Sequence, residues 1–283
     1  MTQDAPLVDP ALATEKEGRL IAQLRQRGSI LVGFSGGVDS VYLAAVAVEA
    51  VGAANTLAVI GRSPSYPAVQ WEAARSVALQ MSVPLLEVDT HELDDPRYAA
   101  NPANRCFYCK TELWSVLVPI AAGRGLAVVA DGSNADDWSD YRPGAQAARD
   151  HGVWSPLSEA GLTKAEIRHR SAVRGLPTAN QPASPCLSSR LPYHVAVTPE
   201  RLAQVERAEA ALRALGITGD LRVRHHGDLA RVELGRAELE SWLEPAASSR
   251  LAAALRSAGY ARASIDLRGF RSGSLNVLEG VGA

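Results

Sequence analysis

The sequence predicts an α/β fold, in which a doubly wound parallel sheet is followed by a small C-terminal α+β domain. Through the first 130 residues, apolar strand-like runs alternate with helix-like segments, which is typical of parallel strands joined by crossover helices. Further along, prolines at positions 177, 182, 185 and 192 interrupt the chain, and the alternation ends. We therefore expect two domains of different architecture.

The elements of the first domain follow from apolar patterning and turn residues. We expect strands at residues 30–33, 56–60, 84–88 and 126–130, with a short fifth strand at 154–157. Helices are expected over 15–26, 41–51, 67–81 and about 110–120, and Thr163 and Glu166 form a capping box that opens a helix ending at Gly175. In the helix over 67–81 the predicted buried stripe consists of Val69, Ala73, Val77 and Met81.

The remaining segments set the expected domain boundaries. We assign residues 1–180 to the first domain, 181–195 to a linker that bears a cysteine, and 196–283 to the C-terminal domain. In the last part we expect a helix over 199–215, strands at 220–225 and 229–234, a helical stretch over 237–258 and a final strand at 263–267. This last domain is expected to serve substrate binding or oligomerisation.

Composition excludes several classes of protein. The 283-residue chain is 47% hydrophobic and 21% charged, as soluble globular proteins are, and its net charge is −2 with a pI of about 6.3. No overall basic field is present, so we expect no nucleic-acid partner. No apolar run is long enough to span a bilayer and the polar start lacks a signal-peptide core, so we expect a cytoplasmic protein without membrane contact.

One turn has the layout of a phosphate-binding site. Strand 30–33 leads into a turn and helix start formed by Ser35, Gly36, Gly37, Val38, Asp39 and Ser40. A strand, a glycine turn and a helix N-terminus together present backbone N–H groups to an anion, and Asp39 can hold magnesium against the phosphates. The spacing differs from both the Walker loop and the dinucleotide fingerprint.

Other polar residues are expected at the same edge of the sheet, because the carboxyl ends of parallel strands meet there. Arg62 and Ser63 follow the second strand, and Asp131 and Asn134 follow the fourth. The latter pair suits magnesium, ribose or substrate contacts, and equally suits an ordinary turn.

Three cysteines, Cys106, Cys109 and Cys186, are too few for a disulfide framework in a reducing compartment. Three thiolates can hold three irons of a 4Fe–4S cluster, or zinc with an open fourth position. They can also be unrelated buried thiols. The polar segments around them, which we expect to be loops, argue against burial.

Several motifs together resemble one family over nearly the whole chain. The turn at 35–40 (SGGVDS) resembles the pyrophosphate loop of the N-type ATP pyrophosphatases, or PP-loop enzymes. More specifically, the chain resembles the LarE family at 104–110 (NRCFYCK), 131–137 (DGSNADD), 184–190 (SPCLSSR), 222–233 (RVRHHGDLARVE) and 266–276 (DLRGFRSGSLN).

The resemblance implies an ATP-dependent sulfur transferase that builds the nickel-pincer nucleotide. ATP and Mg²⁺ would adenylylate a carboxylate of pyridinium-3,5-biscarboxylic acid mononucleotide, and a sulfur nucleophile would displace AMP to leave a thiocarboxylate. In one sub-type a single cysteine gives up its sulfur, whereas in the other three cysteines hold a 4Fe–4S cluster that carries sulfide. This chain has three cysteines and so fits the cluster type, with Asp39 and Cys186 as its catalytic residues.

The resemblance and the charges of the side chains together suggest the substrate-binding residues, which are Lys110, Arg190, Arg222, Arg224 and Glu233. Arg190 could instead pair with an acidic residue. For Arg222 and Arg224 the alternative is a solvated strand face.

Two other functions remain open from the sequence. One is tRNA thiolation, or another adenylylating ligase on the same scaffold; the near-neutral charge counts against tRNA. The other is a nucleotide- or zinc-binding module without catalysis, which a complete phosphate loop disfavours. The expected partners are a small nucleotide substrate, sulfide or a sulfur donor, and copies of the chain itself, for which the resemblance suggests a hexamer.

Overall fold

The computed structural model describes residues 8–139, 143–182 and 184–271, and these form two compact units. The first unit contains the described residues up to Ser63, Ala68–Glu92 and Asn104–Ser184. The second contains the described residues from Pro185 on, together with two short segments from the first half of the chain, Pro64–Pro67 and Leu93–Ala103. None of the described helices combines the length and hydropathy needed to cross a bilayer.

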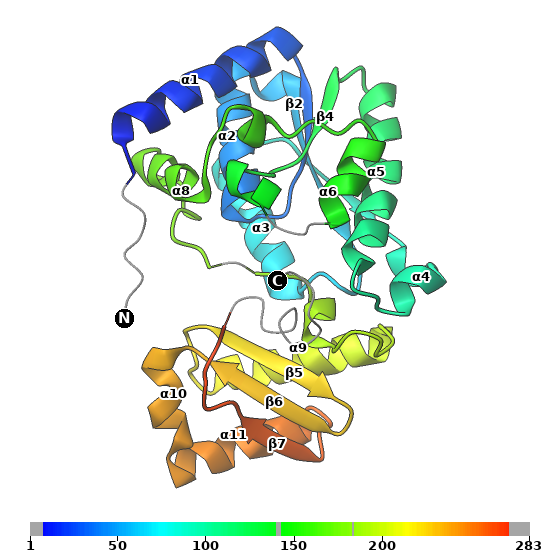
Figure 1. Cartoon of the computed structure of the whole chain (residues 1–283), viewed down its shortest axis with the longest axis vertical. Coiled ribbons are helices and arrows are strands. Elements are labelled where there is room, and N and C mark those ends of the chain that lie inside the picture. Colours follow the sequence, from blue (N-terminus) through cyan, green and yellow to red (C-terminus); the bar gives the residue numbers. More distant parts are fainter. Residues whose placement is uncertain (1–7, 140–142, 183, 272–283) are drawn as a thin grey trace. The chain divides into compact units, whose positions relative to one another are not determined.

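The first unit is built on a four-stranded, all-parallel sheet (Figure 1). Its strands are β1 (Ile30–Gly33), β2 (Thr56–Arg62), β3 (Leu85–Asp89) and β4 (Val128–Ala130), in the order β3-β2-β1-β4. The expected doubly wound α/β fold is confirmed. β1 lies inside the sheet, with β2 on one side and β4 on the other, so the turn that follows β1 sits at the middle of the carboxyl edge.

Helices cover both faces of this sheet because the side chains of β1 alternate between two cores. Ile30 and Val32 pack in a core with residues of α1, α2 and α8, whereas Leu31 packs with Trp114 and Leu117 on the opposite face. Figure 1 shows α1, α2 and α8 on one side and α5 and α6 on the other. The helices of the first unit are α1 (Pro10–Arg27), α2 (Val38–Val51), α3 (Ala68–Gln80), α5 (Arg105–Gly123), α6 (Pro143–Asp150), α7 (Pro156–Glu159) and α8 (Lys164–Val173).

The second unit packs helices against a three-stranded sheet in the order β5-β6-β7. β5 and β6 are antiparallel, whereas β6 and β7 are parallel. Its core joins Leu212, Val223, Val232 and Leu255, which are all fully buried. The elements are α4 (Pro96–Ala99), α9 (Pro199–Ala214), β5 (Leu221–His226), β6 (Leu229–Leu234), α10 (Arg236–Leu243), α11 (Pro245–Ser257) and β7 (Arg262–Ile265).

The predicted buried stripe of α3 is wrong. Ala74 and Ala78 are buried, while Ala73 is exposed and Val69 is 74% exposed. A Cβ atom on Gly36 would lie 2.5 Å from the Cβ of Ala74, so only small side chains fit where this helix meets the turn after β1. Steric space at that turn, rather than apolar periodicity, decides which face of α3 is buried.

Prolines at two positions explain why two further predicted elements differ in the structure. The expected strand over 154–157 is a single bridge between Trp154 and Ala130, since Pro156 has no N–H to continue a ladder and instead begins α7. The helical stretch over 237–258 is two helices. Glu244 is extended in front of Pro245, as a residue before proline prefers to be, and it separates α10 from α11.

The expectation of a loop around the first two cysteines is also wrong. Cys106 and Cys109 lie in the first turns of α5, which begins at Arg105 behind the N-cap Asn104. The two thiols are therefore placed by a regular helix.

A buried ionic network fixes α1 to α2 and α8. Glu17 is 4% exposed and accepts hydrogen bonds from Arg170 at 2.6 Å, Arg174 at 2.8 Å and the Tyr42 hydroxyl at 2.6 Å. Burial alone would raise the pKa of Glu17, but the hydrogen bonds from Arg174, Arg170 and Tyr42 outweigh burial and lower the pKa to about 2. The carboxylate is therefore charged at neutral pH, and it links α1, which carries it, to donors from α2 and α8.

We expect Glu17→Gln to destabilise the protein by about 3 kcal/mol at pH 7, because it leaves two arginines without their buried counter-charge. The ordinary pKa of 4.5 exceeds the folded value of about 2, so this contribution is present above pH 4.5 and disappears as the pH falls towards 2. Chemical denaturation at several pH values measures it. Glu15→Gln, at an exposed position of the same helix, is the control. Equal stability of the two variants at pH 7 would contradict the expectation.

Candidate active site

The turn between β1 and α2 is closed on itself by its two serines. The backbone N–H of Ser35 donates to the Ser40 hydroxyl at 3.2 Å, and the hydroxyl oxygens of Ser35 and Ser40 are also 3.2 Å apart. Gly37 is the N-cap of α2, and the Ser40 hydroxyl donates to its carbonyl at 3.2 Å. The turn therefore places both hydroxyls at a helix N-terminus, which is an arrangement suited to phosphate.

Two glycines allow other segments to approach this turn closely. Gly36 has a φ of +67° and lies against Ala74 of α3. A Cβ atom on Gly132, after β4, would lie 3.1 Å from the backbone nitrogen of Ser40 and 3.3 Å from the Cβ of Asp39. The loop that contains Asp131 and Asn134 is thus held beside the N-terminus of α2, in agreement with the expected meeting of strand ends.

Asp39, in the first turn of α2, has one oxygen paired and one oxygen unused. Its Oδ2 atom accepts from Lys164 Nζ at 2.5 Å, whereas its Oδ1 atom is buried and has no hydrogen-bond partner within the described residues. A buried carboxylate oxygen without a protein donor fits a magnesium ligand, since this ion prefers oxygen ligands. Lys164 was missed by sequence reasoning, which read its segment only as a helix start.

The other predicted nucleotide contacts are engaged with protein groups. Asp131 accepts from the N–H and hydroxyl of Ser133, and Asn134 accepts from the N–H of Asp136. The structure thus shows the ordinary turn that was one of the two alternatives for this segment, and a role in ligand binding stays a prediction.

The two residues at the carboxyl end of β2, its last residue Arg62 and the following Ser63, are also in contact with protein groups. The Arg62 guanidinium lies 4.3 Å from the ring centroid of Trp71 and 3.6 Å from a Glu87 oxygen, and the Ser63 hydroxyl donates to Glu92 at 2.5 Å. Their part in ATP binding also stays a prediction.

The cysteines are distributed over both units. Cys106 is exposed and Cys109 is partly exposed, one helical turn apart on α5 of the first unit. Next to them, Lys110 Nζ lies 5.3 Å from the ring centroid of Trp114. Cys186 belongs to the second unit and is partly exposed. In the ranges that the structure describes, no group of three Cys, His, Asp or Glu side chains is arranged to hold a metal ion.

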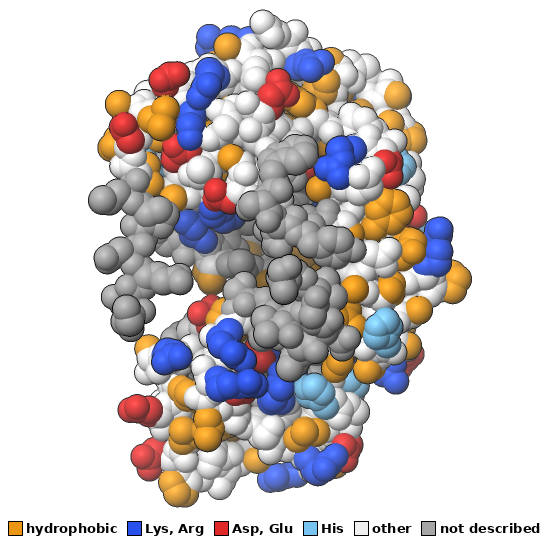
Figure 2. All heavy atoms as spheres, viewed as in Figure 1, with side chains coloured by type: hydrophobic (Ala, Val, Ile, Leu, Met, Phe, Trp, Pro, Cys, Tyr) orange, Lys and Arg blue, Asp and Glu red, His pale blue; other side chains and the backbone are white. Residues whose placement is uncertain are grey.

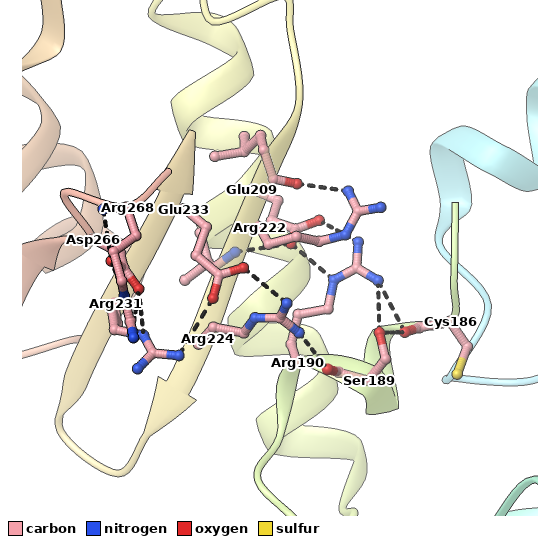
Figure 3. A network of polar contacts seen from close by, with 12 residues as sticks. Cys186, Ser189, Arg190, Glu209, Arg222, Arg224, Arg231, Glu233, Asp266 and Arg268 are labelled. Carbon is pink, nitrogen blue, oxygen red and sulfur yellow. Dashed lines mark hydrogen bonds and ion pairs between the residues drawn. The ribbon is translucent and has the colours of Figure 1, made fainter. Parts of the chain in front are cut away.

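The Cys186 turn is held by a buried arginine (Figure 3). Arg190 is 2% exposed and its Nη1 donates to the carbonyls of Pro185 at 2.5 Å and Cys186 at 2.9 Å. Its Nε and Nη2 donate to the two oxygens of Glu209, both at 2.9 Å. Of the two sequence-based options for Arg190, the structure shows pairing with an acidic residue. Glu209 was missed because it is one of several acidic residues on α9 without a motif around it.

Arg222 and Arg224 are buried, so the alternative of a solvated strand face is wrong for both. They are 7% and 6% exposed. Arg224 donates to Glu233 at 2.8 Å and to the Ser189 carbonyl at 2.8 Å, and Glu233 also accepts from Arg231 at 3.3 Å. Arg222 donates to the Leu221 carbonyl at 2.7 Å. Because each guanidinium has a carboxylate or carbonyl acceptor, both arginines can stay charged inside the domain.

Arg222 keeps its charge at neutral pH. Burial, and then the charge of Arg190, lower its pKa to about 10. Its guanidinium lies 5.1 Å from the ring centroid of Phe270. On the face of the molecule seen in Figure 2, Lys and Arg side chains gather over the second unit. Charged arginines and lysines gathered on one unit suit the binding of an anionic ligand.

Gly36→Ala should destabilise the protein by about 2 kcal/mol, because alanine is strained at positive φ and its Cβ would overlap Ala74. Gly37→Ala is the matched comparison, since Gly37 has a negative φ and the atom nearest its Cβ would be the Ser35 hydroxyl at 3.4 Å. Urea denaturation of both variants measures the difference. Equal losses would argue against the close packing of this turn.

Comparisons with known proteins identify the family of the chain. The NAD synthase family model matches residues 19–100, which include the turn between β1 and α2. An uncharacterised protein of Synechocystis is 42% identical over 246 residues, which cover 87% of this chain and 91% of the relative. The pyridinium-3,5-bisthiocarboxylic acid mononucleotide synthase of Lactiplantibacillus plantarum is 36% identical over 265 residues, covering 94% of this chain and 95% of the synthase.

The resemblance first seen in separate motifs therefore extends over almost the full length of both chains. The fold around the turn between β1 and α2 is that of ATP-using PP-loop enzymes. By its identity to the synthase, the chain belongs to the LarE family of ATP-dependent sulfur transferases.

Proposed function

We propose that this enzyme adenylylates a carboxylate of pyridinium-3,5-biscarboxylic acid mononucleotide and converts it into a thiocarboxylate for the nickel-pincer nucleotide. The observation that carries the proposal is the turn after β1, where two serine hydroxyls, a helix N-terminus and the unused Asp39 oxygen lie together. The family adds the substrate, because the synthase is named for this product.

In the first step, a substrate carboxylate oxygen forms a bond to the α-phosphorus of ATP. The bond from that phosphorus to the oxygen bridging to the β-phosphate breaks, and pyrophosphate leaves with the electron pair. The N–H groups and hydroxyls of the turn would bind the leaving pyrophosphate, and their alignment before the reaction lowers the cost of the developing charge. Asp39 would bind Mg²⁺, which supplies charge stabilisation on the phosphates.

In the second step, a sulfur nucleophile attacks the acyl carbon and AMP leaves. We propose that Cys106, Cys109 and Cys186 hold a 4Fe–4S cluster, whose open iron would carry the sulfide. Three thiolates, with two of them one turn apart on α5, support the ligand chemistry. Such a cluster would supply sulfide from an external donor, so that no cysteine of the chain would be lost.

For the substrate we propose Lys110, Arg222 and Arg224 as the residues that neutralise the nucleotide phosphate, with Glu233 orienting Arg224. The burial of Arg222 and Arg224 supports this, since a desolvated guanidinium binds phosphate more strongly than a solvated one. Arg190, which is occupied by Glu209, is better assigned to holding the Cys186 turn than to the phosphate.

The remaining properties are part of the same proposal. We propose a cytoplasmic homo-oligomer, with the hexamer as the state to test by light scattering. The substrate is a small molecule rather than a nucleic acid, in line with the net charge of −2.

Asp39 and Cys186 should separate the two steps. We expect Asp39→Asn to abolish substrate-dependent pyrophosphate release, because the metal loses its carboxylate. Cys186→Ala should retain pyrophosphate release and lose the thiocarboxylate product, which mass spectrometry detects. Release of pyrophosphate at the wild-type rate by Asp39→Asn would refute the role of the turn, and thiocarboxylate formation by Cys186→Ala would refute that of the cysteine.

Iron and sulfide content tests the sulfur source. Protein purified without oxygen should hold about four irons per chain, and Cys106→Ala, Cys109→Ala and Cys186→Ala should each lower that content. A wild-type protein without iron, whose Cys186 lost the mass of a sulfur after one turnover, would show that the cysteine itself is the donor. That result would leave the ATP chemistry intact.

A further inference from the structure

We propose that Tyr98 is a positioning residue for Cys186, a role that rests on the proposed part of Cys186 in sulfur transfer. Tyr98 lies on α4, which comes from the first half of the chain but belongs to the second unit. Its hydroxyl group fixes the turn that follows Cys186, and so determines where the thiol of this cysteine lies.

The contact between Tyr98 and this turn is fully buried. The hydroxyl oxygens of Tyr98 and Ser188 are 2.7 Å apart, and the two residues are 1% and 0% exposed. Ser188 lies in the 3₁₀ turn Leu187–Arg190, for which Cys186 is the N-cap. A buried hydroxyl that loses its partner is left without water to replace it, so the pair opposes any movement of Ser188 away from α4.

The backbone that carries Tyr98 is itself anchored just beyond the end of α4. Asn101 is fully buried with a φ of +56°, a conformation that asparagine tolerates better than most residues. Its side-chain amide donates to the carbonyl of Pro192 at 2.7 Å and to the carbonyl of Val195 at 2.9 Å. The segment around α4 is therefore bound to the chain just after the Cys186 turn, and the Tyr98 hydroxyl is presented from a fixed place.

Tyr98 and Arg190 hold the turn through different groups. Arg190 donates to the backbone carbonyl of Cys186, whereas Tyr98 contacts the side chain of Ser188. One contact cannot replace the other. Cys186 is partly exposed while Ser188 is fully buried, so the thiol stands at the accessible end of a turn whose inner part is fixed. Misplacing a reacting group by about 1 Å can cost as much as 100-fold in rate, so such a fixed turn matters for attack by sulfur.

Tyr98→Phe removes the hydroxyl group and keeps the ring, and so tests the contact without emptying the core. In metal-free protein, alkylation of Cys186 by iodoacetamide should become roughly fivefold faster, the factor that corresponds to one lost hydrogen bond. Peptide mass spectrometry follows each cysteine separately. Cys106 and Cys109, which lie on α5 of the first unit, should react at their wild-type rates.

Tyr260→Phe is the matched control. Tyr260 is another buried tyrosine of the second unit, 2% exposed, and its hydroxyl lies 3.1 Å from Nδ1 of His225 on β5. Loss of this hydroxyl should leave the alkylation rate of Cys186 unchanged.

Ser188→Ala removes the other half of the hydrogen bond and should reproduce the effect, also if Tyr98→Phe folds poorly. The combined variant should add little to either single change, because both delete the same contact. A general loosening of the protein would accelerate all three cysteines together, and that result would contradict the proposal.

The two reaction steps give a second readout. In single-turnover experiments, Tyr98→Phe should release pyrophosphate at the wild-type rate and form thiocarboxylate about fivefold more slowly. Equal losses in both steps would overturn the proposal, as would wild-type alkylation rates of Cys186 in Tyr98→Phe and Ser188→Ala. A wild-type protein that formed no thiocarboxylate would instead refute the proposed function, and the alkylation rates would still decide whether Tyr98 positions Cys186.

Discussion

The close approach of backbones around the N-terminus of α2 is the constraint on which the first unit depends. Three positions without a Cβ make it possible. A Cβ on Gly33 would lie 2.7 Å from the Trp114 ring, one on Gly36 would overlap Ala74, and one on Gly132 would crowd Ser40. Trp114 and Ala74 belong to α5 and α3, so the same glycines that open the turn to a phosphate also fix how two helices pack. Binding geometry and core packing are therefore set together.

The second unit is subject to a different constraint, because several of its arginines are charged and also buried away from water. Arg190, Arg222 and Arg224 are each less than 8% exposed, and such burial is unfavourable unless oxygens surround each guanidinium. Glu209 and Glu233 supply carboxylates, and the carbonyls of Cys186, Ser189 and Leu221 supply further acceptors. A hydrophobic core of similar size would stabilise the domain at lower cost, so the retention of these charges favours a role in binding an anion.

The sequence predicted the elements whose signals are local. The apolar run of β1, the Thr163–Glu166 capping box and the β5–β6 hairpin lie where pattern and turn chemistry put them. It did not predict features that depend on contacts between distant residues. The face of α3 follows from a glycine more than 30 residues away, and the burial of Arg224 follows from a carboxylate on the neighbouring strand β6. Of the motif at 266–276, the part from position 272 onward lies outside the described residues.

The same limit explains what was missed at the site. Motifs pointed to Asp39, Cys186 and Arg224, because these stand in strings of characteristic residues. Lys164 and Glu209 stand in ordinary helical sequence, and only the fold brings them to Asp39 and Arg190. For Arg224 the structure also shows contacts that its motif does not predict. One guanidinium contacts both the Ser189 carbonyl, next to the Cys186 turn, and Glu233 on β6. If Arg224 binds the substrate phosphate as proposed, the same side chain sets where the Cys186 turn lies relative to that phosphate.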